Sequence, residues 1–219
     1  MKKHDWFRNE RWNSEIERQF FEKLRRARDK AQYLKLQAGC LAKREPKVAL
    51  MLLQRFFEVK DDFWLADVCT IQAEAYLALD NISEAVASFK AAIQREREYP
   101  NHVTTAWYQF ALLVAEKKLA PEYDEVLRLL EERRGDLIFP VLVFARSSGL
   151  ALIHSERGDL EKARFHALQA LDAARKGHSG LRYHAKIGLV GPEYRSVRKH
   201  VERLTKTSPL KRLIPWRNR

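Results

Sequence analysis

The sequence predicts an all-α fold, and three observations lead to this prediction. Apolar residues recur at the i, i+3, i+4, i+7 spacing of a helix along most of the 219 residues, and no two segments alternate as paired strands would. The chain contains only 8 glycines and 7 prolines, so helix breakers are few. Helix-turn-helix segments also recur at a nearly constant spacing, which is typical of an α-solenoid. We therefore expect about four helical hairpins, followed by a basic capping helix and a tail.

Composition narrows the class of protein. Hydrophobic residues make up 46% of the chain and charged residues 32%, which excludes collagen-like and largely disordered chains. A chain of this length buries a core without staples, and its two cysteines fit a reducing compartment. The longest stretch without Asp, Glu, Lys or Arg, residues 99–115, still holds several polar side chains, so no membrane span is expected. The charged start does not resemble a signal peptide, and we expect a cytoplasmic protein.

Charge divides the chain into three segments. The formal net charge is +12, but residues 31–174 hold 18 basic and 21 acidic residues and are close to neutral. Residues 175–219 hold 13 basic and 2 acidic residues. We therefore expect an N-terminal aromatic and basic arm with its helix over residues 1–30, helical repeats over residues 31–175, and a basic C-terminal helix and tail over residues 176–219.

The first helices are predicted from their N-terminal signals. Ser14 and Glu17 form a capping-box pattern, so a helix is expected from Ser14, and the sequence stays favourable for helix to about Arg44. The pattern leaves open whether one helix or two cover this stretch. Pro46 suits the first position of the next helix, which continues with apolar residues at one-face spacing.

Three hairpins are expected downstream. Their helix pairs cover residues 66–79 with 83–97, residues 107–114 with 123–130, and residues 140–156 with 160–174. The apolar run 137–145 is the one segment where a strand could compete. Because it has no second strand to pair with, we expect it to be helical from Pro140 onward.

The spacing of these hairpins is the strongest signal in the sequence. The small residue early in each second helix is Ala49, Ala85, Val126 and Ala163, and the separations are 36, 41 and 37 residues. In this spacing the chain resembles the tetratricopeptide repeat family, whose unit is a helix-turn-helix of about 34 residues.

The resemblance covers roughly residues 31–175 and is clearest over residues 66–97. There the family's small and aromatic positions are occupied by Ala73, Tyr76, Ala85, Phe89 and Ala92. Residues 144–174 match next best, although His154 and Ala167 replace aromatic residues. We expect the apolar residues at these positions to form the repeat core.

The resemblance implies a concave groove, lined by the first helices of successive hairpins, that binds a protein or peptide partner. The implied partner-binding residues are mixed in charge: Asp67, Thr70, Glu74, Tyr108, Leu112, Ser148 and Leu152. They include no Lys, Arg or Asn. Some members of the family bind the terminal carboxylate of a partner with Lys, Asn and Arg on this face. The absence of these residues argues against such a carboxylate clamp here and leaves the ligand type open.

Catalytic motifs are missing from the sequence. The seven histidines contain no His-Glu-x-x-His pair, the two cysteines lie 29 residues apart, and no glycine-rich phosphate loop is present. His154 is expected to be a packing residue, and Cys40 and Cys69 are expected to be small buried residues on inward helix faces. We therefore expect no catalytic residues, no metal and no cofactor.

The basic C-terminal segment is the second candidate site. Gly191 and Pro192 introduce a helix whose apolar stripe is expected to cap the solenoid. The charges on its other faces, together with two in the tail, form an expected surface for polyanions or an acidic partner: Arg195, Arg198, Lys199, Arg203, Lys211 and Arg212.

Several functional hypotheses follow from these sites. The leading one is a non-enzymatic adaptor that binds a partner segment in the groove, and the alternative is a nucleic-acid-binding module that uses the basic C-terminal region. An acidic protein surface, or a tail that only aids solubility, ranks ahead of specific nucleic acid, because few aromatic residues lie near the basic ones to stack on bases. A homo-oligomeric scaffold that exchanges tails is the third hypothesis, and an enzyme is the last.

Overall fold

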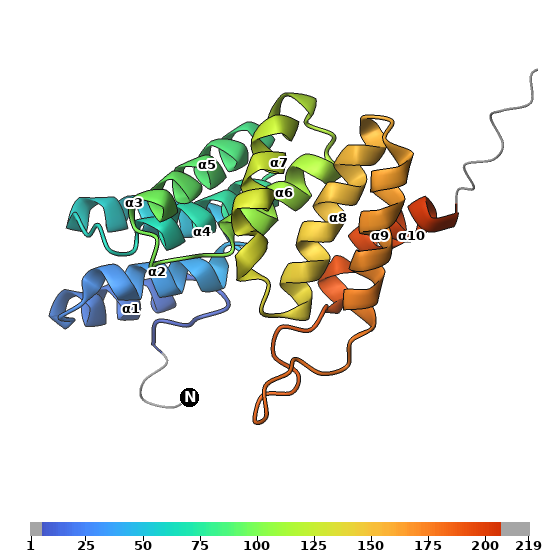
Figure 1. Ribbon diagram of the computed structural model, residues 1–219. Helices are drawn as coiled ribbons and strands as arrows, with labels where there is room; N and C mark the ends of the chain where they lie inside the picture. The colour runs from blue at the N-terminus through green and yellow to red at the C-terminus, as the bar shows by residue number, and fades with distance from the viewer. Residues whose placement is uncertain (1–5, 207–219) are drawn as a thin grey trace, which may run out of the picture. The chain divides into compact units, whose positions relative to one another are not determined.

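The computed structural model describes residues 6–206, and every regular element among them is helical (Figure 1). The all-α prediction is therefore confirmed. The helices group into two compact units, Met1–Ala106 and Trp107–Arg219. The apolar run 137–145 forms no strand, and a helix begins at Pro140 as expected.

Unit 1 contains five helices, each begun by a local signal. They are α1 (Ser14–Arg26), α2 (Lys30–Leu41), α3 (Pro46–Val59), α4 (Leu65–Ala78) and α5 (Ile82–Glu98). Two helices, not one, cover the stretch from Ser14 to Arg44, because Ala27 is extended and Asp29 caps a new helix. The capping-box prediction is wrong by one position: Asn13 caps α1 and accepts from the Ile16 N–H at 2.8 Å.

Consecutive helices of unit 1 pack in pairs, α2 on α3 and α4 on α5, and α3 also packs on α4. The apolar stripe of each helix enters a common core in which Phe56 and Leu52 are fully buried. The N-terminal segment joins this core through Trp6, whose ring lies 5.4 Å from that of Phe20 and 4.9 Å from that of Tyr33.

The N-terminal segment is also fastened to α2 by polar contacts. The buried Gln37 accepts from the Asn9 main-chain N–H at 3.0 Å, and its own amide donates to the Asn9 carbonyl at 2.8 Å. A fully buried amide needs such partners, since burying it unpaired costs free energy. The start of the described chain is therefore part of the unit 1 core.

Unit 2 contains α6 (Ala106–Glu116), α7 (Tyr123–Glu132), α8 (Pro140–Glu156), α9 (Leu160–Arg175) and α10 (Arg195–Lys206). Short 3₁₀ segments precede α7, follow it and precede α10: Ala120–Glu122, Arg133–Asp136 and Pro192–Tyr194. Figure 1 shows α8 and α9 side by side. Alanines on α9 allow this close approach, and Gly149 on α8 does the same toward Ala111 and Leu130, which a Cβ at that position would meet at 3.6 and 3.3 Å.

The basic helix α10 packs its apolar side on α8 and α9. Val197 and Val201 are buried, and the ring of Tyr194 lies 5.6 Å from that of Phe144. The apolar stripe expected at the C-terminal end is therefore in contact with the last helix pair.

None of the helices between residues 6 and 206 combines the length and apolar character that a membrane span needs. The expectation that Cys40 is buried is wrong, since this thiol is exposed, whereas Cys69 is half-buried. The core side of α2 is taken by Ala38 and Leu41, which lie on either side of Cys40 in sequence. Burial raises the pKa of the Cys69 thiol.

Two adjacent phenylalanines on α3 provide a test of the unit 1 core. Phe56 is fully buried, whereas Phe57 is 45% exposed. We expect Phe56→Ala to lower the free energy of unfolding by about 3–5 kcal/mol, and Phe57→Ala to lower it much less. Chemical denaturation followed by circular dichroism measures both values. Equal losses in the two variants would contradict the packing described above.

Candidate functional site

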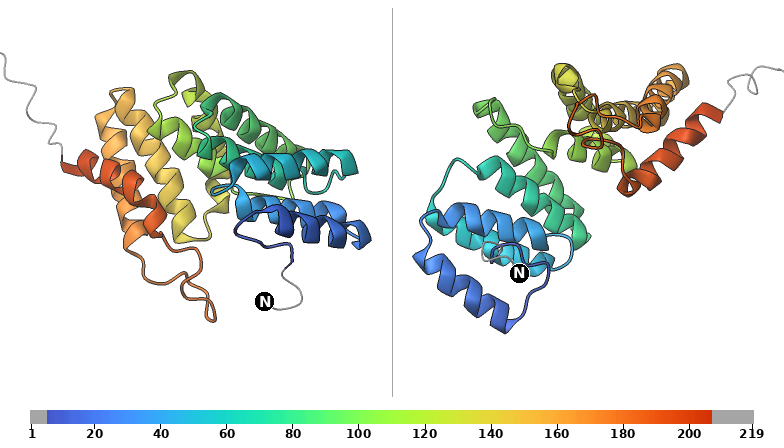
Figure 2. Two further views of the ribbon diagram at one scale, coloured as in Figure 1. Left: turned by 180° about the vertical axis from the view of Figure 1, so that it is seen from behind. Right: turned by 90° about the horizontal axis from the view of Figure 1, so that it is seen from below.

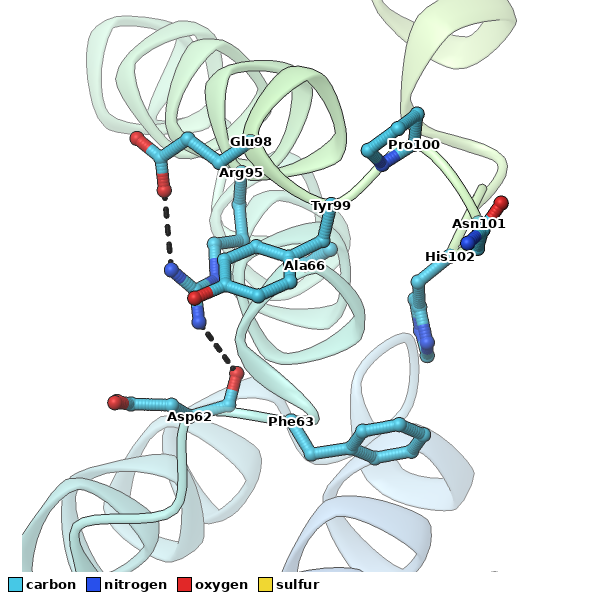
Figure 3. A pocket seen from close by; sticks show the side chains of 9 residues that line it. All are labelled: Asp62, Phe63, Ala66, Arg95, Glu98, Tyr99, Pro100, Asn101 and His102. Atoms are coloured by element: carbon cyan, nitrogen blue, oxygen red, sulfur yellow. Dashed lines mark hydrogen bonds and ion pairs between the residues drawn. The ribbon is translucent and has the colours of Figure 1, made fainter.

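The candidate site is a pocket of unit 1 with a volume of about 630 Å³, where the α3–α4 loop meets the C-terminal end of α5 (Figure 3). Its floor is Ala66 on α4, and aromatic rings stand on two of its sides. The lining residues are Asp62, Phe63, Ala66, Arg95, Glu98, Tyr99, Pro100, Asn101 and His102.

The α3–α4 loop holds Phe63 by a local hydrogen-bonded turn. The Asp61 carboxylate accepts from the main-chain N–H groups of Phe63 at 2.9 Å and Trp64 at 3.3 Å. An acidic side chain that bonds main-chain donors two and three residues later fixes the chain just before a helix begins. The Phe63 ring, 65% exposed, is thus presented from an ordered loop and packs edge-on against Trp64 at 4.6 Å between centroids.

Arg95 connects the two walls of the pocket. Its guanidinium donates to the Asp62 carbonyl at 3.0 Å and to the Glu98 carboxylate at 3.0 Å, and it lies 3.8 Å from the centre of the Tyr99 ring. Figure 3 shows Tyr99 stacked over this guanidinium. The hydrogen bonds from Arg95 and then Gln94 lower the pKa of Glu98. Tyr99 is therefore held in place although it is 55% exposed.

A network of charged and aromatic groups supports the His102 side of the pocket. Asp67 lies between two partners, with its carboxylate 2.5 Å from the His102 Nε2 and 3.8 Å from the Lys35 ammonium. Lys35 is buried and lies 3.3 Å from the centre of the Trp64 ring. Burial lowers the pKa of Lys35, and the nearby Asp67 opposes this effect.

The segment after the pocket is fastened by a second polar network. Glu96 is 1% exposed and accepts from Thr104 twice, from the main-chain N–H at 2.8 Å and from the hydroxyl at 2.6 Å. The Thr104 hydroxyl also lies 3.0 Å from that of Thr70, which donates to the Ala66 carbonyl at 2.8 Å. Residues 99–104 are therefore tied to both α4 and α5.

The pocket offers apolar surface with few polar groups. Its rings and Ala66 suit a large apolar side chain, and the Asn101 carboxamide has no hydrogen bond within the described part of the chain. An amide of this kind both donates to and accepts from a main chain. Among residues 6–206 no group of three or more His, Cys, Asp or Glu is arranged to hold a metal ion.

Of the predicted groove residues of unit 1, Asp67 contacts the pocket through His102. Asp67 is committed to Lys35 and His102, and Thr70 is buried with its hydroxyl hydrogen-bonded. Glu74 is half-buried. The unit 1 part of the predicted groove is therefore occupied largely by side chains with internal partners.

The predicted groove residues of unit 2 are mostly buried. Tyr108 and Leu112 on α6 are 9% and 7% exposed, and Ser148 is fully buried. The Ser148 hydroxyl has no hydrogen-bond partner among the described residues. Leu152 is half-buried. Their role in partner binding stays a prediction.

The predicted basic surface lies on α10 in part. Arg195, Arg198, Lys199 and Arg203 are exposed there, and Arg198 donates to Glu202 at 3.1 Å. Lys211 and Arg212 lie outside the described residues.

Sequence reasoning missed the pocket because most of its lining residues, its exposed aromatic rings among them, lie outside the periodic helices. Phe63 stands in a connecting loop, and Tyr99 and His102 follow the end of α5. Two features of the sequence could have indicated the pocket. Phe63 and Trp64 are adjacent aromatic residues between two predicted helices, and the Tyr99-Pro100 pair follows the helix predicted over residues 83–97.

No family model, curated protein or solved structure matches this chain significantly. The resemblance to tetratricopeptide repeats therefore stays a prediction from the sequence.

The ion pair behind the pocket gives a prediction about stability. Asp67→Ala leaves the buried Lys35 ammonium without its carboxylate, so we expect a loss of about 1–3 kcal/mol in the free energy of unfolding. The double variant Lys35→Met/Asp67→Ala removes the charge as well and should recover part of the loss. Chemical denaturation of the unchanged protein, of Asp67→Ala, of Lys35→Met and of the double variant measures the coupling.

Glu58→Ala is the matched control, because Glu58 and Arg55 form an exposed pair on α3 with side chains 59% exposed. Such pairs contribute little to stability. If Asp67→Ala cost no more than Glu58→Ala, the carboxylate would not be a structural partner of Lys35.

Proposed function

We propose that this chain is a non-enzymatic adaptor that holds a segment of a partner protein, with the unit 1 pocket as its anchor point. One observation carries the proposal. Two large aromatic side chains, Phe63 and Tyr99, are more than half exposed beside a cavity, and both are held by specific contacts. Exposed aromatic residues that are already ordered lose little conformational entropy on binding, and they dominate binding hot spots.

The fold hypothesis behind this proposal is a tetratricopeptide-like α-solenoid. Support comes from the sequence spacing of about 36–41 residues and from the helix pairs α2–α3, α4–α5 and α8–α9, which correspond to three of the four expected hairpins. Solenoids of this kind function by binding rather than by catalysis, and the cytoplasm is the compartment that we propose for this one.

The chemistry of the pocket indicates the kind of segment that fits. An aromatic or large aliphatic side chain would enter between Phe63 and Tyr99, while Asn101 would bond the main chain of an extended peptide. Acidic and basic groups stand together on the rim, and Arg95 is already bonded to Asp62 and Glu98. The pocket therefore favours an apolar anchor over a charged one.

The experiment is selection of a displayed random peptide library on the full chain, followed by fluorescence anisotropy with the selected peptides. We expect the selected peptides to share a Trp, Phe or Leu. We also expect Tyr99→Ala to weaken their binding by about tenfold or more, because truncating an aromatic hot spot costs about 2 kcal/mol.

Two further variants locate the site. Tyr183→Ala removes an exposed tyrosine of unit 2 and should leave peptide binding unchanged. Glu74→Ala probes the groove predicted from the sequence. Peptides that respond to Glu74→Ala but not to Tyr99→Ala or Phe63→Ala would move the site to that groove. A library that yields no binding peptide would contradict the proposed function.

A further inference from the structure

The connection between α9 and α10 is an ordered loop in unit 2. Ser179 closes this loop by two hydrogen bonds. The Ser179 N–H donates to the Ala185 carbonyl and the Ser179 hydroxyl donates to the His184 carbonyl, both at 2.8 Å. The same hydroxyl accepts from the Leu181 N–H at 3.1 Å. These bonds close residues 179–185 into a small hairpin-like turn, and Figure 2 shows the loop extending past the ends of α8 and α9.

The base of the loop is also anchored. The Val141 N–H, at the start of α8, donates to the Gly188 carbonyl at 2.8 Å. Gly188 has a φ of +70° and lies against Phe139, whose Cβ would be only 2.6 Å from a Cβ at residue 188. Only glycine fits this conformation and this contact. The loop is thus positioned by its own hydrogen bonds and by α8.

The loop presents an aromatic ring that the core does not use. Tyr183 is 80% exposed, the highest value among the large apolar side chains of the described residues. The Arg182 guanidinium lies 5.2 Å from the centre of its ring. An ordered, exposed tyrosine flanked by a cation offers a flat surface on which a planar group can stack.

Further basic residues stand along α10. Arg195, Lys199, Arg203 and Lys206 stand at i, i+4, i+8 and i+11, which places them on one side of the helix. Within residues 6–206 none of these four forms an ion pair or hydrogen bond with another side chain. Because Val197 and Val201 turn the opposite side toward α8 and α9, the basic side faces solvent.

Few carboxylates offset this charge. Residues 175–206 contain nine basic residues and only two acidic ones, Glu193 and Glu202. Glu202 already accepts from Arg198 at 3.1 Å. The helix of 12 residues is about 18 Å long, so its cations form a line and not a compact spot.

We propose that Tyr183, its loop and the basic side of α10 bind single-stranded nucleic acid without strong sequence preference. Tyr183 stacks on a base, and the cations of the loop and of α10 follow the phosphates. This combination of a stacking ring and a basic track is what single-strand binding requires. Duplex recognition would instead need an element that enters a groove, and the loop presents one ring and no row of base-reading side chains.

The site lies in unit 2 and shares no residue with the unit 1 pocket, so neither proposal depends on the other. To the basic residues predicted from the sequence, the structure adds Tyr183 as a ring on which a base can stack, and the sequence did not reveal that this ring is exposed.

The experiment is fluorescence anisotropy of labelled short oligouridine and oligothymidine with the full chain, at about 0.15 M salt. We expect Tyr183→Ala to weaken binding by about fivefold to 150-fold, because stacking on one aromatic side chain contributes about 1–3 kcal/mol. Tyr183→Phe should retain binding, since it keeps the ring. Tyr99→Ala, which removes an exposed tyrosine of unit 1, should bind as the unchanged protein does.

The salt dependence tests the basic track separately. Replacing Arg195 and Lys199 by Gln should reduce the slope of log affinity against log salt by about 1.4, since each contact with a single strand contributes about 0.7. The matched control replaces Lys23 and Lys30, two exposed lysines of unit 1, and removes the same charge. This control should leave the slope unchanged.

Three outcomes would overturn the proposal. Equal binding by Tyr183→Ala and the unchanged protein would show that no stacking occurs. Equal competition by poly-aspartate would show a surface for acidic chains in general. Sedimentation with phosphatidylserine vesicles, combined with no binding of either oligonucleotide, would assign the loop and α10 to an anionic membrane.

Discussion

Each helix of this chain has one apolar stripe that it cannot bury alone, and the rest of the structure depends on this constraint. Free energy is gained only when neighbouring helices cover each other's stripes, as α2 does with α3 and α8 with α9. Small residues determine how closely two helices approach. Alanines on α9 and Gly149 on α8 stand where larger side chains would keep the helices apart. The connecting segments contribute less to this packing, and each candidate site takes its exposed aromatic residues from such a segment: Phe63, Tyr99 and Tyr183.

The exposed aromatic residues stand out, because burial of apolar side chains determines how the rest of the chain packs. Phe63, Tyr99 and Tyr183 remain in water although the chain buries other phenylalanines completely. Each is held by contacts that do not bury it: an aspartate turn before Phe63, a guanidinium beneath Tyr99, and a serine-fixed loop around Tyr183. Holding a side chain in one conformation costs conformational entropy, and a side chain that stays exposed gains little hydrophobic free energy in return. The binding roles that we propose for these residues account for such arrangements at the ends of helices.

Periodicity made the helices predictable, because the apolar stripe and its flanking prolines are local properties. Helices begin at Pro46 and Pro140 as expected. The cap of α1 was misplaced by one residue because Asn13 and Ser14 are both good caps, and only the geometry selects between them. The roles of Asp67 and Thr70 were not predictable, since their partners Lys35, His102 and Thr104 lie 32 to 35 residues away in sequence. The pocket likewise depends on the hydrogen bond from Arg95 to the Asp62 carbonyl, and these two residues are 33 apart in sequence.

The two candidate sites use different physical forces, and this follows from their surroundings. In the unit 1 pocket, the one guanidinium, Arg95, is already bonded to Glu98, and most of the lining is apolar, so binding there rests on short-range contact and shape, which salt affects little. On the loop and α10 of unit 2, cations stand almost without carboxylates, so attraction extends over a Debye length and weakens as salt rises. A flexible anion gathered by this field would still need a local contact to be held in place. Tyr183 is positioned to supply that contact, which is why its ring and not the charge decides what the surface can recognise.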